Sequence, residues 1–116
     1  MFICDDAPGY RLLLRTVLEP RGAEVVGEAS DGRMCVERVV DAQPDLVLLD
    51  LKMPGGDGME ALPELRRRVP DAKVVVLTTA PAAEVEEQTR RLGATGFIQK
   101  PTDITGLPDE LRRALA

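Results

Sequence analysis

Short apolar runs alternate with helix-spaced apolar stripes along the whole of this 116-residue chain. Runs of strand length lie at residues 2–4, 46–49, 74–77 and 96–99, and a shorter run begins at Val25-Val26. The helical stripes lie at residues 10–18, 36–40, 59–69, 83–92 and 107–115. Strands that alternate with helices at this spacing form a parallel sheet with right-handed crossovers. The pattern therefore predicts an α/β fold with helices on both faces of the sheet.

Five strand and helix units fit a doubly wound (βα)5 fold with a parallel five-stranded sheet in the flavodoxin-like order 2-1-3-4-5. The length suits one compact domain, so residues 1–116 should form a single unit. The run at 46–49 is apolar throughout, which favours a central strand covered on both faces. The fourth helix carries many charged residues and few apolar ones, so we expect it to pack weakly.

Charge and hydropathy narrow the classes of function. The net charge of -5 leaves no basic stripe for phosphate contacts, so we expect no direct nucleic-acid binding by this domain. No apolar stretch approaches the roughly 18 residues of a membrane span, and the first strand pattern begins directly after Met1. These features predict a cytoplasmic protein without membrane contact.

The cysteine and histidine content limits the available chemistry. Cys4 lies in an apolar strand run and Cys35 on a helical pattern, so we expect two buried, reduced thiols and no disulfide framework. The chain has no histidine, which excludes an internal imidazole as base, nucleophile or metal ligand. Any chemistry that needs a histidine, such as phosphoryl transfer from a phosphohistidine, must therefore use a histidine of a partner.

Polar side chains stand where four of the apolar runs stop. Asp5 and Asp6 follow residues 2–4, Asp50 follows residues 46–49, and Thr78 and Lys100 follow the two C-terminal runs. In open α/β sheets, ligands bind at the carboxyl ends of the strands, where the strand order reverses. In the predicted order this switch point lies between the first and third strands. These side chains should therefore share one site.

Three carboxylates at that edge would repel one another and raise each other's pKa unless a cation neutralised them. An all-oxygen site with room for water suits Mg²⁺, and Mn²⁺ could replace it on the same grounds. Each residue also has an ordinary interpretation. An aspartate before a helix is often an N-cap, a lysine at a strand end is usually solvated, and Thr78 and Phe97 suit a strand and a core.

Four segments occur in a characteristic order: Asp5-Asp6, then 50–54 (Asp-Leu-Lys-Met-Pro) with Asp57-Gly58, then Leu77-Thr78, then 97–101 (Phe-Ile-Gln-Lys-Pro). Together they resemble the receiver domain of two-component response regulators, over nearly the whole chain. The stretch 27–32 is also similar to receivers attached to helix-turn-helix output domains of the nitrate-response type.

The resemblance implies a metal-dependent phosphoacceptor. Asp50 would accept the phosphoryl group, Asp6 would be a direct Mg²⁺ ligand, and Asp5 would be a second acidic group acting largely through water. Asp50 and the backbone carbonyl of Lys52 would complete the protein's share of the metal shell.

The resemblance also implies a switch. Lys100 would contact the phosphoryl group, Thr78 would hydrogen-bond it, and Phe97 occupies the aromatic switch position, which Tyr10 on the first helix cannot fill. Phosphorylation leaves the site more negative by about one charge, so donors must move in and reshape the surface of the fourth helix, fifth strand and fifth helix. A sensor histidine kinase is the implied donor. An output domain or target protein is the implied receiver of the signal, and a phosphorylation-dependent homodimer stays open.

The loop after the fourth strand departs from the family pattern. Many receivers have an alanine directly after the threonine and acidic residues soon afterward, whereas here Thr79, Ala80 and Pro81 follow Thr78. In receiver domains, the residues at the positions of Lys52 and Ala80 affect the dephosphorylation rate, so the resemblance does not determine the phosphoryl lifetime.

The alternative classes of protein are a small phosphatase-like enzyme with an aspartyl nucleophile, a flavin-binding module and a pseudo-receiver that is never phosphorylated. The lysine at position 52 argues against the first because such enzymes normally carry D-x-D there.

Overall fold

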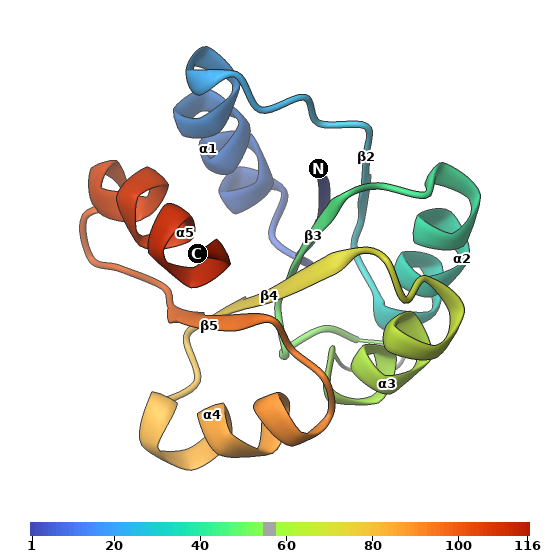
Figure 1. Ribbon diagram of the computed structural model, residues 1–116. Helices are drawn as coiled ribbons and strands as arrows, with labels where there is room; N and C mark the ends of the chain where they lie inside the picture. Colours follow the sequence, from blue (N-terminus) through green and yellow to red (C-terminus); the bar gives the residue numbers. More distant parts are fainter. Residues whose placement is uncertain (55–57) are drawn as a thin grey trace.

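The computed structural model describes residues 1–54 and 58–116, and this part of the chain forms one five-stranded parallel sheet with helices on both sides (Figure 1). In chain order the elements are β1 (Phe2–Cys4), α1 (Pro8–Leu18), β2 (Gly27–Ala29), α2 (Gly32–Ala42), β3 (Leu46–Leu49), α3 (Gly58–Arg68), β4 (Lys73–Thr78), α4 (Ala82–Arg91), β5 (Gly96–Gln99) and α5 (Leu107–Leu115). The strand order β2-β1-β3-β4-β5 confirms the predicted order. Residues 55–57 of the predicted loop after β3 lie outside the described residues.

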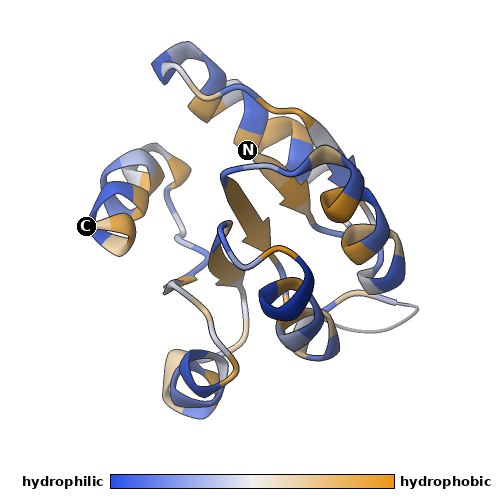
Figure 2. Ribbon diagram, turned by 45° about the vertical axis from the view of Figure 1, so that its right-hand side comes forward, coloured by the Kyte–Doolittle hydropathy of each residue, from blue (hydrophilic) through white to orange (hydrophobic). Residues whose placement is uncertain are grey.

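Successive strand residues face opposite sides of the sheet, and both sides are buried. Ile3, Leu48 and Val75 pack in the cluster that contains the apolar residues of α1 and α5. Phe2, Val47 and Val74 pack with α2 and α3, and α4 adds the partly buried Val85 to that cluster. Colouring by hydropathy shows apolar strands at the centre, surrounded by helices that carry both polar and apolar residues (Figure 2). Burial on both faces explains why residues 46–49 are apolar without alternation.

The second strand begins later than the sequence predicted. We expected a strand that starts at Val25-Val26, but β2 starts at Gly27, which pairs with Phe2 of β1. A Cβ atom at position 27 would lie 2.5 Å from the Phe2 ring, so a larger residue there would force the ring to shift. Val26 is 49% exposed and donates its backbone N–H to the carbonyl of Met1. The β-branched pair therefore leads into the strand instead of forming it.

The predicted helices are all present, and their ends have local causes. Pro8 occupies the first turn of α1, where its missing N–H costs nothing. Asp31 caps α2 by accepting a hydrogen bond from the backbone N–H of Met34 at 2.8 Å. Gly22 has a φ of 97° and ends the short 3₁₀ turn Glu19–Arg21 that follows α1. Among the described residues, no helix has the length and apolar character needed to cross a membrane.

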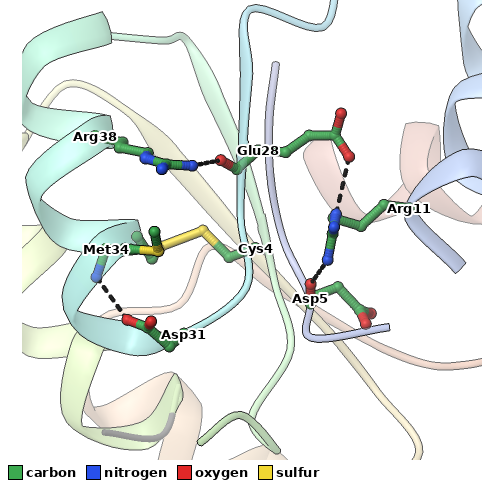
Figure 3. The surroundings of a disulfide bond; sticks show 8 residues. Cys4, Asp5, Arg11, Glu28, Asp31, Met34 and Arg38 are labelled. Atoms are coloured by element: carbon green, nitrogen blue, oxygen red, sulfur yellow. Dashed lines mark hydrogen bonds and ion pairs between the residues drawn. A yellow bond between two sulfur atoms is a disulfide. The ribbon is translucent and has the colours of Figure 1, made fainter. Parts of the chain in front are cut away.

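Cys4 and Cys35 form a disulfide that joins β1 to the first turns of α2 (Figure 3). Both residues are buried, as predicted, but the expectation of reduced thiols was wrong. The two cysteines are 31 positions apart in the sequence, and their Cα atoms lie 5.9 Å apart. Only the packing of α2 against β1 brings them together, and the spacing of two cysteines in a sequence carries no information about that contact.

Candidate functional site

The ladder of the sheet brings the predicted site residues to one edge. Cys4 and Leu49 pair at the ends of β1 and β3, and the N–H of Asp50 donates to the carbonyl of Cys4 at 2.9 Å. On the other side, the N–H of Lys100 donates to the carbonyl of Thr78 at 2.7 Å. These backbone bonds place the residues after β1, β3 and β5 beside one another at the carboxyl edge of the sheet.

Asp5, Asp6 and Asp50 form an acidic cluster at this edge. Each offers a carboxylate oxygen, and these oxygens all lie within 4.8 Å of one another. Asp5 and Asp50 are buried, whereas Asp6 is exposed. A set of hard oxygen donors with one side open to water fits a divalent cation such as Mg²⁺, which keeps several waters when it binds to carboxylates.

Lys100 reaches into the cluster from the end of β5. Its Nζ donates to Asp5 Oδ2 at 2.7 Å and to Asp50 Oδ2 at 2.9 Å, and its side chain is only 11% exposed. It is therefore not the solvated lysine that a strand end usually carries. Three carboxylates against one ammonium leave the site with two unbalanced negative charges. That charge matches a divalent cation.

Burial and charge act against each other at these groups. Burial raises the pKa of Asp5 above its ordinary value, although the hydrogen bonds from Lys100 and from the N–H of Ala7 oppose the rise. Burial alone would lower the pKa of Lys100, but the hydrogen bonds and charges of Asp5 and Asp50 outweigh it and raise that pKa. Lys100 therefore stays charged at neutral pH, because the nearby carboxylates stabilise its protonated form.

The acidic pair does not cap the helix that follows it. The N-cap of α1 is Ala7, which has no side-chain capping bond. Asp5 instead accepts the N–H of Ala7 at 2.9 Å, a local turn, and Asp50 accepts the N–H of Lys52 at 3.1 Å in the same way. Each of these two bonds fixes one carboxylate oxygen and leaves the other, Oδ2, turned to Lys100.

Thr78 and Phe97, the other two predicted residues, lie on the neighbouring strands β4 and β5 in different surroundings. Thr78 ends β4, is fully buried, and its hydroxyl accepts the N–H of Ala80 at 3.3 Å. Phe97 of β5 is partly buried and packs against the core on the α4 side. It lines a hollow of about 110 Å³ together with Thr89 and Thr95, and also a wider groove of about 510 Å³ bordered by α4, β5 and α5.

Two further residues support the site, and the sequence pattern did not single them out. Arg11 of α1 donates to the backbone carbonyl of Asp5 at 2.6 Å and to the Glu28 carboxylate at 3.0 Å (Figure 3). Glu28 lies on β2, an edge strand of the sheet, and its backbone carbonyl accepts a hydrogen bond from Arg38 of α2. The Arg11 guanidinium thus links α1 to β2 and to the backbone of Asp5. This long-range contact has no local sequence signal.

Gly58 supports the site from the other side. It begins α3, and a Cβ atom at this position would lie 2.0 Å from the backbone carbonyl oxygen of Asp50. Its N–H donates to the carbonyl of Leu51 at 3.1 Å. The start of α3 therefore approaches the backbone of Asp50 so closely that only a residue without a side chain fits.

The chain belongs to the response regulator receiver domain family, whose model matches residues 1–112. It is 35% identical over 113 residues to the chemotaxis protein CheY of Thermotoga maritima, covering 97% of this chain and 94% of CheY. It is 36% identical over 117 residues to the transcriptional regulatory protein PdtaR of Mycobacterium tuberculosis, covering all of this chain and 56% of PdtaR. The response regulator TrrA of Thermotoga maritima, solved in complex with Mg²⁺ and BeF, has a TM-score of 0.84 and 28% identity, with 98% of this chain and 96% of TrrA covered.

Membership of this family settles the class of protein. The chain is a phosphoacceptor domain of two-component signalling and not a metabolic enzyme. The phosphatase-like and flavin-binding alternatives are therefore set aside. The family implies histidine kinases and output partners, and acidic metal pockets of the kind that the three aspartates form here.

Proposed function

We propose that Asp50 accepts a phosphoryl group from a partner histidine kinase in a Mg²⁺-dependent reaction. The observation that carries this proposal is the position of the Asp50 carboxylate, which lies within 4.8 Å of two other carboxylates and accepts a hydrogen bond from Lys100. Asp50 is the only one of the three aspartates that follows the central strand β3. It is therefore flanked by the acidic pair on one side and by the β4 and β5 residues on the other.

Asp5, Asp6 and Asp50 would hold Mg²⁺ together with the backbone carbonyl of Lys52, and Mn²⁺ suits the same donors. The bound cation would supply positive charge for the phosphoryl oxygens and for the carboxylates. The charge balance supports this part of the proposal, because the cluster with Lys100 carries two unbalanced negative charges. The structure of TrrA in complex with Mg²⁺ and BeF supports it as well.

In the transfer, one oxygen of the ionised Asp50 carboxylate forms a bond to phosphorus as the bond from phosphorus to the donor nitrogen breaks. The donor imidazole keeps that electron pair and belongs to the kinase, since this chain has no histidine. Positioning and charge neutralisation are the main tasks of such a site. Lys100, already bonded to Asp50 Oδ2, would move its hydrogen bond onto a phosphoryl oxygen.

The same reaction would switch the surface formed by α4, β5 and α5. The phosphoryl group adds negative charge beside the end of β4, and the Thr78 hydroxyl would leave the N–H of Ala80 to donate to it. That movement would free space for Phe97 to turn inward. Phe97 already borders the groove among α4, β5 and α5, so its rotation would change a surface that a partner can contact.

The proposal extends to where the domain acts and with which partners. We propose a cytoplasmic location, a sensor histidine kinase as phosphoryl donor, and an output domain or separate target protein that recognises the switched surface. A phosphorylation-dependent homodimer is a further form that this surface would support. The relative PdtaR, about twice as long as the region it shares with this chain, is a transcriptional regulatory protein, which favours transcription as the output.

Intact-mass measurement after incubation with acetyl phosphate and Mg²⁺ tests the proposal. The parent chain should gain the mass of one phosphoryl group, and the Asp50→Asn variant should gain none, because the amide is not a nucleophile of this kind. An Asp41→Asn variant is the matched control, since Asp41 is an exposed residue of α2, and it should label like the parent. Stoichiometric phosphorylation of Asp50→Asn would refute the assignment of Asp50 as the acceptor. A parent chain that takes up no phosphoryl group would be a pseudo-receiver.

A further inference from the structure

The aromatic ring of Tyr10 lies against the ammonium group of Lys100. The Nζ atom is 4.1 Å from the centre of the ring, within the range of a cation–π contact. Tyr10 is the third residue of α1, and Lys100 follows β5, so the contact joins opposite ends of the chain. The ring is thus the third neighbour of an ammonium group that already donates to Asp5 and Asp50.

The position of Tyr10 is fixed from two sides. Its neighbour Arg11 bonds to the carbonyl of Asp5 at 2.6 Å, which anchors the first turns of α1 to the backbone of the acidic cluster. Tyr10 itself packs, partly buried, against the core that α1 and α5 share. These contacts restrain the ring next to Lys100, whose side chain is 11% exposed.

The ring contact differs in kind from the other two contacts of the ammonium. Asp5 and Asp50 are the groups that a divalent cation would also bind, so the cation would weaken their hold on Lys100 by taking up their charge. The face of an aromatic ring attracts an ammonium without offering a ligand to Mg²⁺. Lysine has a long, flexible side chain, so a contact that survives metal binding would keep its ammonium in the pocket.

We propose that Tyr10 is a positioning residue for phosphoryl transfer: its ring holds the Lys100 ammonium over Asp50 and shields it from water. This inference rests on the proposed role of Asp50. The ring, and not the hydroxyl, carries the role, because the Tyr10 hydroxyl is buried and has no hydrogen-bond partner among the described residues. The surroundings agree, since burial raises the pKa of Tyr10 above its ordinary value while the charge of Lys100 opposes the rise.

Two variants separate the ring from its bulk and from its hydroxyl. Tyr10→Phe keeps the aromatic face and removes the unpartnered hydroxyl, so it should fold well and take up phosphoryl groups from acetyl phosphate at a rate within about twofold of the parent. Tyr10→Leu keeps an apolar side chain in the core but removes the aromatic face, and it should label about three- to tenfold more slowly. Tyr10→Met serves the same purpose if the leucine variant folds poorly, because methionine fills irregular core space.

NMR of the lysine side chains reports the contact without any phosphodonor. The chain has only three lysines, Lys52, Lys73 and Lys100, so their ε-methylene signals are few. The Lys100 signal should be shifted upfield by the ring current in the parent and in Tyr10→Phe, and it should return to an ordinary position in Tyr10→Leu. This signal reports the ring contact itself, and the labelling rate reports whether the contact contributes to phosphoryl transfer.

The outcomes are distinct. The inference is supported if Tyr10→Leu labels slowly and lacks the upfield shift, while Tyr10→Phe keeps both the parental labelling rate and the shift. Labelling of Tyr10→Leu at the parental rate would overturn it, and so would a phenylalanine variant as slow as the leucine variant. If the parent itself takes up no phosphoryl group, the proposed function fails. A parental Lys100 signal without an upfield shift, by contrast, defeats the role of Tyr10 alone.

Discussion

At the scale of single residues, Asp6 has a different environment from the other two carboxylates of the cluster. It is exposed, whereas Asp5 and Asp50 are buried and bonded to Lys100. Replacing Asp6 with Asn removes one charge that would face the cation and leaves the lysine pairs intact. Because metal affinity depends on ligand charge, we expect Mg²⁺ binding to weaken by at least about tenfold.

Titration with Mg²⁺, followed by backbone NMR shifts around the cluster, measures this change. The Asp41→Asn variant again provides the control, with the same change of charge on the surface of α2. Equal Mg²⁺ affinity in Asp6→Asn and in the parent would remove Asp6 from the ligand set.

Gly58 makes the second prediction at this scale. A Gly58→Ala variant would force its Cβ to within 2.0 Å of the Asp50 carbonyl oxygen, so α3 or the backbone of the acceptor must move. Overpacking typically costs about 1 to 3 kcal/mol of the free energy of unfolding, and a clash with backbone belongs at the upper end of that range. Gly9→Ala is the matched control, because nothing lies within 4 Å of a Cβ atom there and alanine suits a helix. That variant should change stability by no more than about 1 kcal/mol. Urea unfolding compares the two, and equal stability would show that α3 does not pack this closely.

At the scale of elements, α4 is held less firmly than its neighbours. Its only buried residue is Thr89, whereas α3 buries Gly58, Ala61, Leu62 and Leu65. The charged residues of α4 form ion pairs mostly within the helix itself, as Arg90 does with Glu86 and Glu87. Such exposed pairs contribute little to stability. The weak packing that the sequence predicted for this helix is therefore present, and it makes α4 the element that a switch can move at low cost.

Amide hydrogen exchange tests this property. Protection should be lower in α4 than in α3, and phosphorylation should change it in α4 and β5 first. A Thr78→Ala variant should still take up the phosphoryl group but show little change in α4, because the hydroxyl that couples the two is missing. Exchange in α4 as slow as in α3, or an unaltered response in Thr78→Ala, would contradict the switch proposed for this surface.

At the scale of the whole molecule, the disulfide links the strand that precedes Asp5 to helix α2 across 31 positions of sequence. Closing a loop of this length stabilises a folded chain by about 3 to 4 kcal/mol, mainly by restricting the unfolded state. Reduction should therefore lower the free energy of unfolding by that amount. Urea unfolding with and without a dithiol reductant measures it, and a Cys35→Ala variant should not respond to the reductant.

Disulfides are rare in reducing compartments, so the bond is the feature that agrees least with a cytoplasmic location. Thiol titration of the denatured chain, kept from air and reductant, should find no free thiol. Two titratable thiols would restore the original expectation of reduced cysteines.

The sequence by itself determined the order of elements and the residues at the end of each strand. Apolar runs and helical stripes are local patterns, and they predicted five alternating strand and helix units. The flavodoxin-like strand order that fits five such units then predicted that Asp5, Asp50 and Lys100 lie at one edge. Only the tertiary structure decided the contacts that no local pattern encodes. These are the disulfide between Cys4 and Cys35, the Arg11 bond beside Asp5 and the ring of Tyr10 over Lys100. The reason is physical: periodicity fixes which face of an element is buried, whereas pairing across the core depends on how separate elements settle against one another.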